Sequence, residues 1–143
     1  MNIDDLIHTL HSEKLSCVIM QSNGTIVKCH CRGVIDLYEL LRDTPSVLDG
    51  ATIADKVVGR GAAALMVLGK VKRLHTDVLS RPALELLQQA GIKVSFTTLA
   101  DNIINRAGDG ICPVEKLTSS AKTAQEALPL IKQFLQEMAT KNH

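Results

Sequence analysis

The sequence is nearly devoid of aromatic residues. Of 143 residues only two are Phe and one is Tyr, and Trp does not occur. Proteins that bind single-stranded nucleic acid stack the bases on exposed aromatic rings. No such stacking surface is expected here. Apolar residues still make up 45% of the chain, so we expect a core built from aliphatic side chains.

An excess of one charge is also missing. Lys and Arg total 16 against 15 for Asp and Glu, which gives a formal net charge of +1 without long runs of one sign. Proteins that bind nucleic acid through its phosphates carry clusters of Lys and Arg. We therefore expect no nucleic-acid partner for this chain.

Signals for a membrane or for secretion are absent from the sequence. The longest apolar stretch, residues 57–69, is interrupted by Arg60 and is too short to cross a bilayer. The first five residues are acidic rather than typical of a signal peptide. We therefore expect no membrane association and a cytoplasmic protein with reduced thiols. The four cysteines form no C-x-x-C pair: Cys17, Cys29, Cys31 and Cys112.

The hydrophobic pattern predicts a single α/β domain over residues 1–143. Asn-Gly at 23–24 indicates a hairpin between strands over 16–20 and 25–31. Residues 51–71 are small and apolar almost throughout, which predicts one helix buried on most sides. The order implies a three-layer α/β/α fold with a mixed sheet of four to five strands. Other helices are predicted over 2–11, 35–41, 81–90, from 112 and over 123–138, and other strands over 72–80 and 92–99.

A glycine pattern lies inside the long apolar stretch. Residues 59–64 match the G-x-G-x-x-A pattern of dinucleotide-binding sites, with Asp77 about twenty residues further on. Such glycines should follow a hydrophobic strand, whereas residues 52–58 are only half apolar. Tight helix packing is the favoured interpretation. Arg60 is the exception, because a charge in an apolar run needs a partner or an anion.

The segment Cys112-Pro113-Val114-Glu115 is typical of a helix start. Pro suits the first helical position, and Glu in the first turn can cap the backbone. A thiol at a helix N-terminus ionises more readily and is a candidate nucleophile. A buried structural cysteine explains the same segment equally well.

Metal ligands are too few for a zinc site. In a strand, Cys29 and Cys31 would share one face, with His30 on the other. Zinc would need two further ligands, and no second pair has suitable spacing. We therefore predict no metal and no cofactor, and favour buried small side chains for these cysteines.

Several of these segments together resemble a small uncharacterised bacterial family (a domain of unknown function) with a cytidine deaminase-like fold. In deaminases one helix begins with His-or-Cys, Ala, Glu and a later one with Pro-Cys-x-x-Cys, which hold a zinc-bound water and its proton shuttle. Laid on this chain, the motifs fall near 59–61 and on 112–115, where the zinc ligands are missing. The resemblance implies a deaminase-like fold without zinc-dependent deamination. It covers residues 15–117 and rests on 55–64, 77–80, 91–92, 105–106 and 112–115.

The resemblance also implies a pocket at the sheet edge. Two helix N-termini, near 55–60 and at 112, would point towards it, and helix N-termini attract anions. We expect a small anionic or nucleotide-like ligand there. The residues expected to bind it are Lys56, Gly59, Arg60, Asn105 and Arg106, and those expected to carry any chemistry are Asp55, Cys112 and Glu115.

Structural roles for these residues and two other functions remain open. Asp55 would suit a helix cap, Arg106 a surface loop and Glu115 a capping box. One alternative function is a metal-free enzyme with Cys112 as nucleophile and Asp55 or Glu115 as base. The other is an interaction module that forms a homodimer through the apolar helix or the C-terminal helix. Ligand binding is favoured over both.

Overall fold

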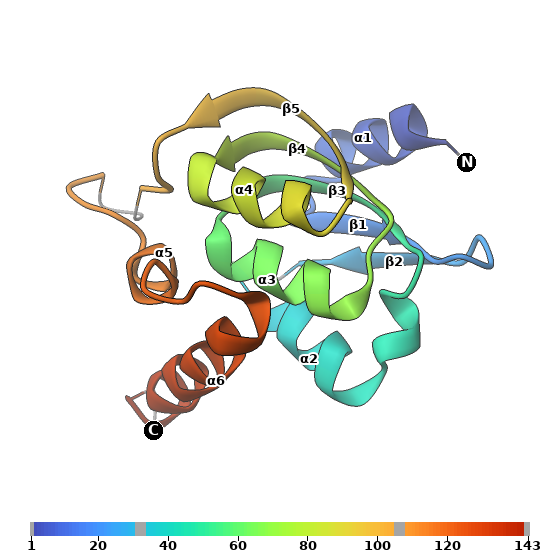
Figure 1. Ribbon diagram of the computed structural model, residues 1–143. Helices are drawn as coiled ribbons and strands as arrows, with labels where there is room; N and C mark the ends of the chain where they lie inside the picture. The colour runs from blue at the N-terminus through green and yellow to red at the C-terminus, as the bar shows by residue number, and fades with distance from the viewer. Residues whose placement is uncertain (1, 31–33, 105–107, 142–143) are drawn as a thin grey trace.

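Five strands form one mixed sheet with helices on both faces (Figure 1). The computed structural model describes residues 2–30, 34–104 and 108–141. The strand order is β2-β1-β3-β4-β5, which confirms the predicted three-layer α/β/α fold with a mixed sheet. The strands are β1 (Cys17–Met20), β2 (Ile26–Cys29), β3 (Thr52–Val58), β4 (Arg73–Ser80) and β5 (Lys93–Ala100). The helices are α1 (Ile3–Ser12), α2 (Ile35–Asp43), α3 (Arg60–Gly69), α4 (Arg81–Gln89), α5 (Pro113–Thr118) and α6 (Ala124–Lys141), with a 3-10 turn at Pro45–Val47.

The hairpin predicted from Asn-Gly is present. Gly24 has a φ of +90°, in the left-handed region that favours glycine. Its N–H donates to the carbonyl of Gln21, and the N–H of Gln21 donates to the carbonyl of Thr25, both at 2.8 Å. These bonds set the register that places Cys17 opposite Cys29.

The single helix predicted over 51–71 is wrong, because its first half is strand β3. This strand lies in the middle of the sheet, antiparallel to β1 and parallel to β4. A strand buried on both faces has the same continuous apolar pattern as a buried helix, so periodicity does not separate them. Asp55 and Lys56 further interrupt the pattern. The glycines at 59 and 61 therefore do follow a strand.

Two hydrophobic clusters lie on opposite faces of the sheet. The larger contains Ile53 and Leu74 of the sheet and most of α3. The smaller holds Val18 and Ala54 against α1. The β3–α3–β4–α4–β5 succession places α3 and α4 on one face, whereas α1 covers the other (Figure 1).

Helix α3 is the innermost helix, as its small residues predict. Seven of its ten residues are buried, among α2, α4, α5 and α6. At Gly69 an added methyl group would lie 2.7 Å from Cδ1 of Leu48, so only glycine allows this approach. Within the described residues, no helix is both long enough and apolar enough to cross a membrane.

Candidate functional site

The three parallel strands end at the same edge of the sheet. Gly59 follows β3, Ser80 ends β4, and Ile103 lies three residues beyond β5. In open α/β sheets ligands bind beyond the carboxyl ends of the strands. The expected pocket would therefore lie at this edge.

One carboxylate, that of Glu115 in α5, connects all three strand ends. Its Oε1 accepts hydrogen bonds from the main-chain N–H of Arg60 and from Oγ of Ser80, both at 2.8 Å. Its Oε2 accepts from the main-chain N–H of Ile103. Glu115 is only 2% exposed. A buried carboxylate thus occupies the N-terminus of α3, where an anion is favoured by the helix dipole.

The guanidinium of Arg60 points to main-chain carbonyls rather than to a carboxylate. Nε donates to Thr118 (3.2 Å), and the two terminal nitrogens donate to Pro82 (3.0 Å) and Ala121 (2.7 Å). Thr118 is the last residue of α5, so the cation lies at that helix's C-terminus, where the dipole favours it. Arg60 therefore holds α5 by its side chain, while its own N–H binds Glu115.

Both glycines of the dinucleotide-like pattern are in close contact with the same part of the chain. A methyl group on Gly59 would lie 3.0 Å from Cγ1 of Ile103 and 3.4 Å from Oε1 of Glu115. One on Gly61 would lie 2.4 Å from Cγ1 of Val114. The space that a pyrophosphate takes in a dinucleotide-binding site is here filled by α5.

Cys112 lies at the N-cap of α5 and is partly exposed with a free thiol. Its thiol makes no capping bond, and α5 has only six residues. The main-chain N–H of Cys112 donates to the carbonyl of Ile103 at 2.7 Å. The two predicted helix starts, at Arg60 and Cys112, thus lie beside each other, as α3–α5 contacts show.

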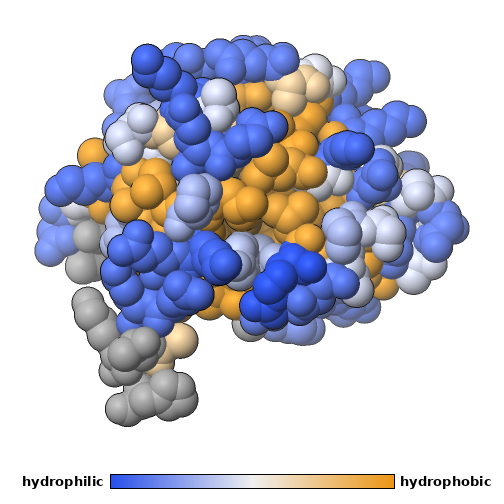
Figure 2. Space-filling view, turned by 60° about the horizontal axis from the view of Figure 1, so that its bottom comes forward, coloured by the Kyte–Doolittle hydropathy of each residue, from blue (hydrophilic) through white to orange (hydrophobic). Residues whose placement is uncertain are grey.

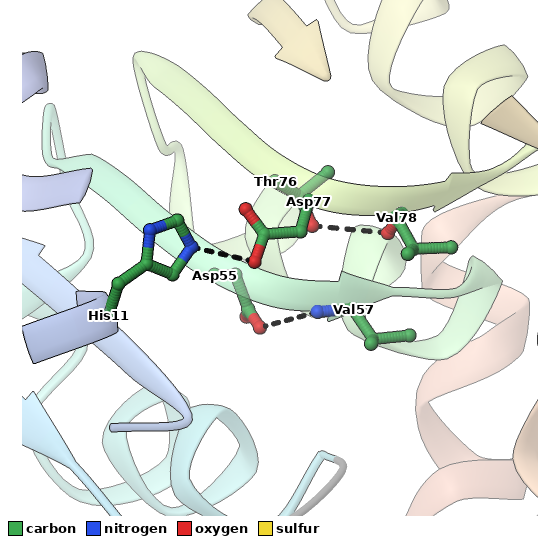
Figure 3. A network of polar contacts seen from close by, with 6 residues as sticks. All are labelled: His11, Asp55, Val57, Thr76, Asp77 and Val78. Carbon is green, nitrogen blue, oxygen red and sulfur yellow. Dashed lines mark hydrogen bonds and ion pairs between the residues drawn. The ribbon is translucent and has the colours of Figure 1, made fainter. Parts of the chain in front are cut away.

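Asp55 lies elsewhere, in the middle of β3. It is buried, at 9% exposed, and sits opposite Cys17 on one side and Thr76 on the other. Its Oδ1 accepts a 3.3 Å hydrogen bond from the N–H of Val57 (Figure 3). Burial raises the pKa of Asp55 to about 7, with a smaller contribution from the charge of Asp77. Gly59 is roughly 13 Å further along the chain, so Asp55 stands apart from Glu115.

A second polar contact near Asp55 was not visible in the sequence. His11, at the end of α1, and Asp77 of β4 form a hydrogen bond, with Nε2 and Oδ2 2.8 Å apart (Figure 3). The two residues are 66 positions apart, and no motif connects them. Asp77, in the middle of β4, therefore contacts a histidine of α1. Lys56, which follows Asp55 in β3, is exposed.

Cys17 and Cys29 are buried register partners beside Asp55. A hydrogen bond to Cys29, burial and the charge of Asp55 raise the pKa of the Cys17 thiol well above its ordinary value. The protonated thiol is a poor nucleophile and a poor metal ligand. Over the ranges that the structure describes, no group of three or more His, Cys, Asp or Glu could hold a metal ion.

One cavity lined by described residues lies away from this edge, between β2 and α2. Its volume is about 370 Å³, and three acidic residues, Asp36, Glu39 and Asp43, contribute to its wall. Lys28 and His30 also line this cavity and Asp43 is paired with Arg42, so its wall carries both signs of charge. The remaining lining residues are Val27, Lys28, Cys29, His30, Leu40 and Thr44.

The predicted residues Asn105 and Arg106, and also Cys31, lie outside the described residues.

An apolar area marks another part of the surface. Figure 2 shows it surrounded by hydrophilic residues, on the face that carries α2 and α6 in Figure 1. Partly exposed apolar residues of these helices include Leu41, Leu128 and Leu135. Of the two helices predicted for the interaction module, the C-terminal helix α6 lies on this face, whereas the apolar helix α3 is buried.

Comparisons with known proteins find a matching family and a related solved structure. The family model described as "Domain of unknown function (DUF1893)", TM1506, matches residues 5–135. A solved structure, that of the DUF1893 family protein TM1506 from Thermotoga maritima, superposes with a TM-score of 0.80 and 23% sequence identity, covering 93% of this chain and 92% of that one. No curated protein matches. Because the family model spans most of its length, the chain belongs to the DUF1893 family.

Proposed function

We propose that the protein binds a small anionic or nucleotide-like ligand at the carboxyl edge of β3, β4 and β5. The observation that carries the proposal is the set of donors around Glu115. The N–H of Arg60, the hydroxyl of Ser80 and the N–H of Ile103 each follow or end a different parallel strand and converge on one carboxylate. Donors fixed by three strands are already oriented for an anion before any ligand arrives.

In this proposal the carboxylate of Glu115 occupies the anion site of the free protein, and a bound ligand replaces it there. A carboxylate or phosphate oxygen can accept the same three hydrogen bonds. Helix α5 is six residues long and is held by Arg60 at its other end, so it can shift while remaining attached. Asn105 and Arg106, two and three residues after Ile103 in the sequence, would supply further contacts, as would Lys56. The fold that we propose is a zinc-free variant of the deaminase-like architecture.

The test uses thermal unfolding of the wild type and of Glu115→Ala with inorganic phosphate, acetate and a panel of nucleotides. Removing the carboxylate leaves three buried donors without an acceptor, so E115A should be destabilised by roughly 2–4 kcal/mol. An anion that takes its place should raise the melting temperature of E115A saturably. The wild type should respond to the same ligand at higher concentration, because Glu115 competes.

Glu126→Ala is the matched control, because Glu126 also accepts a main-chain N–H, that of Lys122, but is exposed. General salt effects should be equal in E126A and E115A. Rescue of E115A alone, with no response in the wild type to any ligand, would show that Glu115 is a permanent structural group. That result would overturn the proposal.

The enzyme alternative rests on Cys112, a partly exposed free thiol beside the same strand end. Glu115, one of its two proposed bases, is already engaged, because both of its carboxylate oxygens accept hydrogen bonds. Asp55 is buried in mid-strand. Ligand binding that survives Cys112→Ser, with loss of any product, would favour catalysis by this thiol.

A further inference from the structure

Strand β5 forms an open edge of the sheet. In the part of the chain that the structure describes, β4 is its only strand neighbour. Figure 1 shows β5 as the outermost strand, beyond β4. Along its other side, main-chain N–H and C=O groups face outward at alternate residues. Most of its eight residues are exposed, including Phe96 at 39% and the neighbouring Thr97 and Thr98.

Beyond Lys93, its first residue, β5 lacks the usual protection of an edge strand. Natural edges are blocked by short length, by Pro, by a bulge or by charged residues. Residues 94–100 contain no charge and no Pro, and they include the strand formers Val94, Phe96, Thr97 and Thr98. The opposite edge, β2, has only four residues and carries Lys28. The two edges therefore differ, and β5 is the one suited to pairing.

We propose that β5 pairs antiparallel with β5 of a second copy of this chain, around a twofold axis at Thr97. In this register Lys93 lies opposite the partner's Asp101, and the reverse pair closes the other end of the ladder. Charge complementarity selects it, because a shift by one residue places Lys93 opposite a neutral residue, the partner's Ala100 or the partner's Asn102. A twofold axis makes both ends identical.

The same pairing covers the exposed side chains of the strand. Phe96 lies opposite the partner's Thr98, an aromatic and β-branched pair that stabilises antiparallel ladders. Asp101 receives a hydrogen bond from Arg81 at 2.9 Å, yet its side chain is 88% exposed and accessible to a second cation. Lys93 is the first residue of β5 and Asp101 follows its last, so the two lie at opposite ends of a strand roughly 23 Å long and cannot pair within one molecule.

Charge exchange tests the register. Sedimentation at low ionic strength is compared for the wild type, K93D, D101K and K93D/D101K. The wild type should be a dimer, and each single variant should raise the dimer dissociation constant about tenfold or more, since like charges then meet at both ends. The double variant should return to within about threefold of the wild type. Because D101K also breaks the Arg81 contact, recovery in the double variant is the decisive result.

K132D is the matched control for K93D, because Lys132 is an exposed residue of α6 and the charge change is the same. It should leave the dimer intact. A cross-link provides a second measurement that does not depend on charge. Thr97 faces its own copy at an expected Cα separation of about 4.5–5.5 Å, within disulfide range, so T97C should form a covalent dimer on mild oxidation. T98C should not, and the wild type measures the background from native cysteines.

A wild type that stays monomeric at high micromolar concentration would overturn the proposal. A dimer whose dissociation constant is unchanged in K93D and in D101K, and that does not cross-link through T97C, would also overturn it. The apolar face on α2 and α6 would then be the interface. None of these substitutions touches Glu115, Ser80 or Ile103. The outcome is therefore independent of anion binding.

Discussion

Asp55 is a carboxyl group held in the middle of a central strand with little access to water. Its raised pKa, about 7 against an ordinary 3.8, means that the native state binds this proton more tightly than the unfolded chain does. The resulting stability is complete below about pH 4 and is lost as the pH rises through about 7. Within that window the free energy of unfolding falls by about 1.4 kcal/mol per pH unit from this group.

Asp55→Asn should remove that slope, because the amide stays neutral while its oxygen can still accept from the N–H of Val57. Urea unfolding at pH 4.5 and pH 8 should show D55N gaining several kcal/mol relative to the wild type at the higher pH. Asp49→Asn, at an exposed acid, is the control and should keep the wild-type slope. An unchanged slope in D55N would contradict the burial argument.

The thiols should differ sharply in reactivity. Iodoacetamide at pH 7.5 should modify Cys112, which is partly exposed, at least about tenfold faster than Cys17 or Cys29. Burial and the raised pKa protect Cys17. Mass spectrometry of peptides over a time course measures the rates, with urea-denatured protein as the reference. Equal rates in the native protein would show that the hairpin opens readily.

Helices α3 and α5 pack closely because Gly61 has no side chain. Gly61→Ala should destabilise the protein by about 1–3 kcal/mol, because the new Cβ meets the branched side chain of Val114. In an unobstructed helix the same change would stabilise by up to about 1 kcal/mol. Combining G61A with Val114→Ala should recover part of the loss. Chemical denaturation of the three variants gives the coupling energy, and strict additivity would rule out the proposed contact.

Local elements could be predicted where the residues encode them directly. Gly24 and its Asn neighbour define the hairpin, and the small residues of α3 indicate close packing. Strand β3 was missed because a strand buried on both faces lacks alternation. The partners of Glu115 were missed as well, since a main-chain N–H such as that of Ile103 has no sequence signature. Only Ser80, directly before Arg-Pro, carries a signal, that of a helix N-cap.

At the scale of the whole molecule, stability should decrease from the sheet centre outward. Hydrogen–deuterium exchange should find the amides of β3 among the slowest, because β3 has a bonded strand on each side and buried residues on both faces. The second half of α6, residues 132–139, is mostly exposed and should exchange at least about 100-fold faster. Comparable protection in that segment would indicate a partner on α6.

The carboxylate of Glu115 also constrains the order in which the chain folds during synthesis. All five strands precede Glu115 in the sequence. The N–H of Arg60 and the hydroxyl of Ser80 therefore lack their acceptor until α5 has been synthesised. A nascent chain that stops short of α5 contains all five strand segments but lacks the acceptor for these donors. The fold is therefore completed only by its last two helices, because α6 also contributes Ala127 and Ile131 to the core.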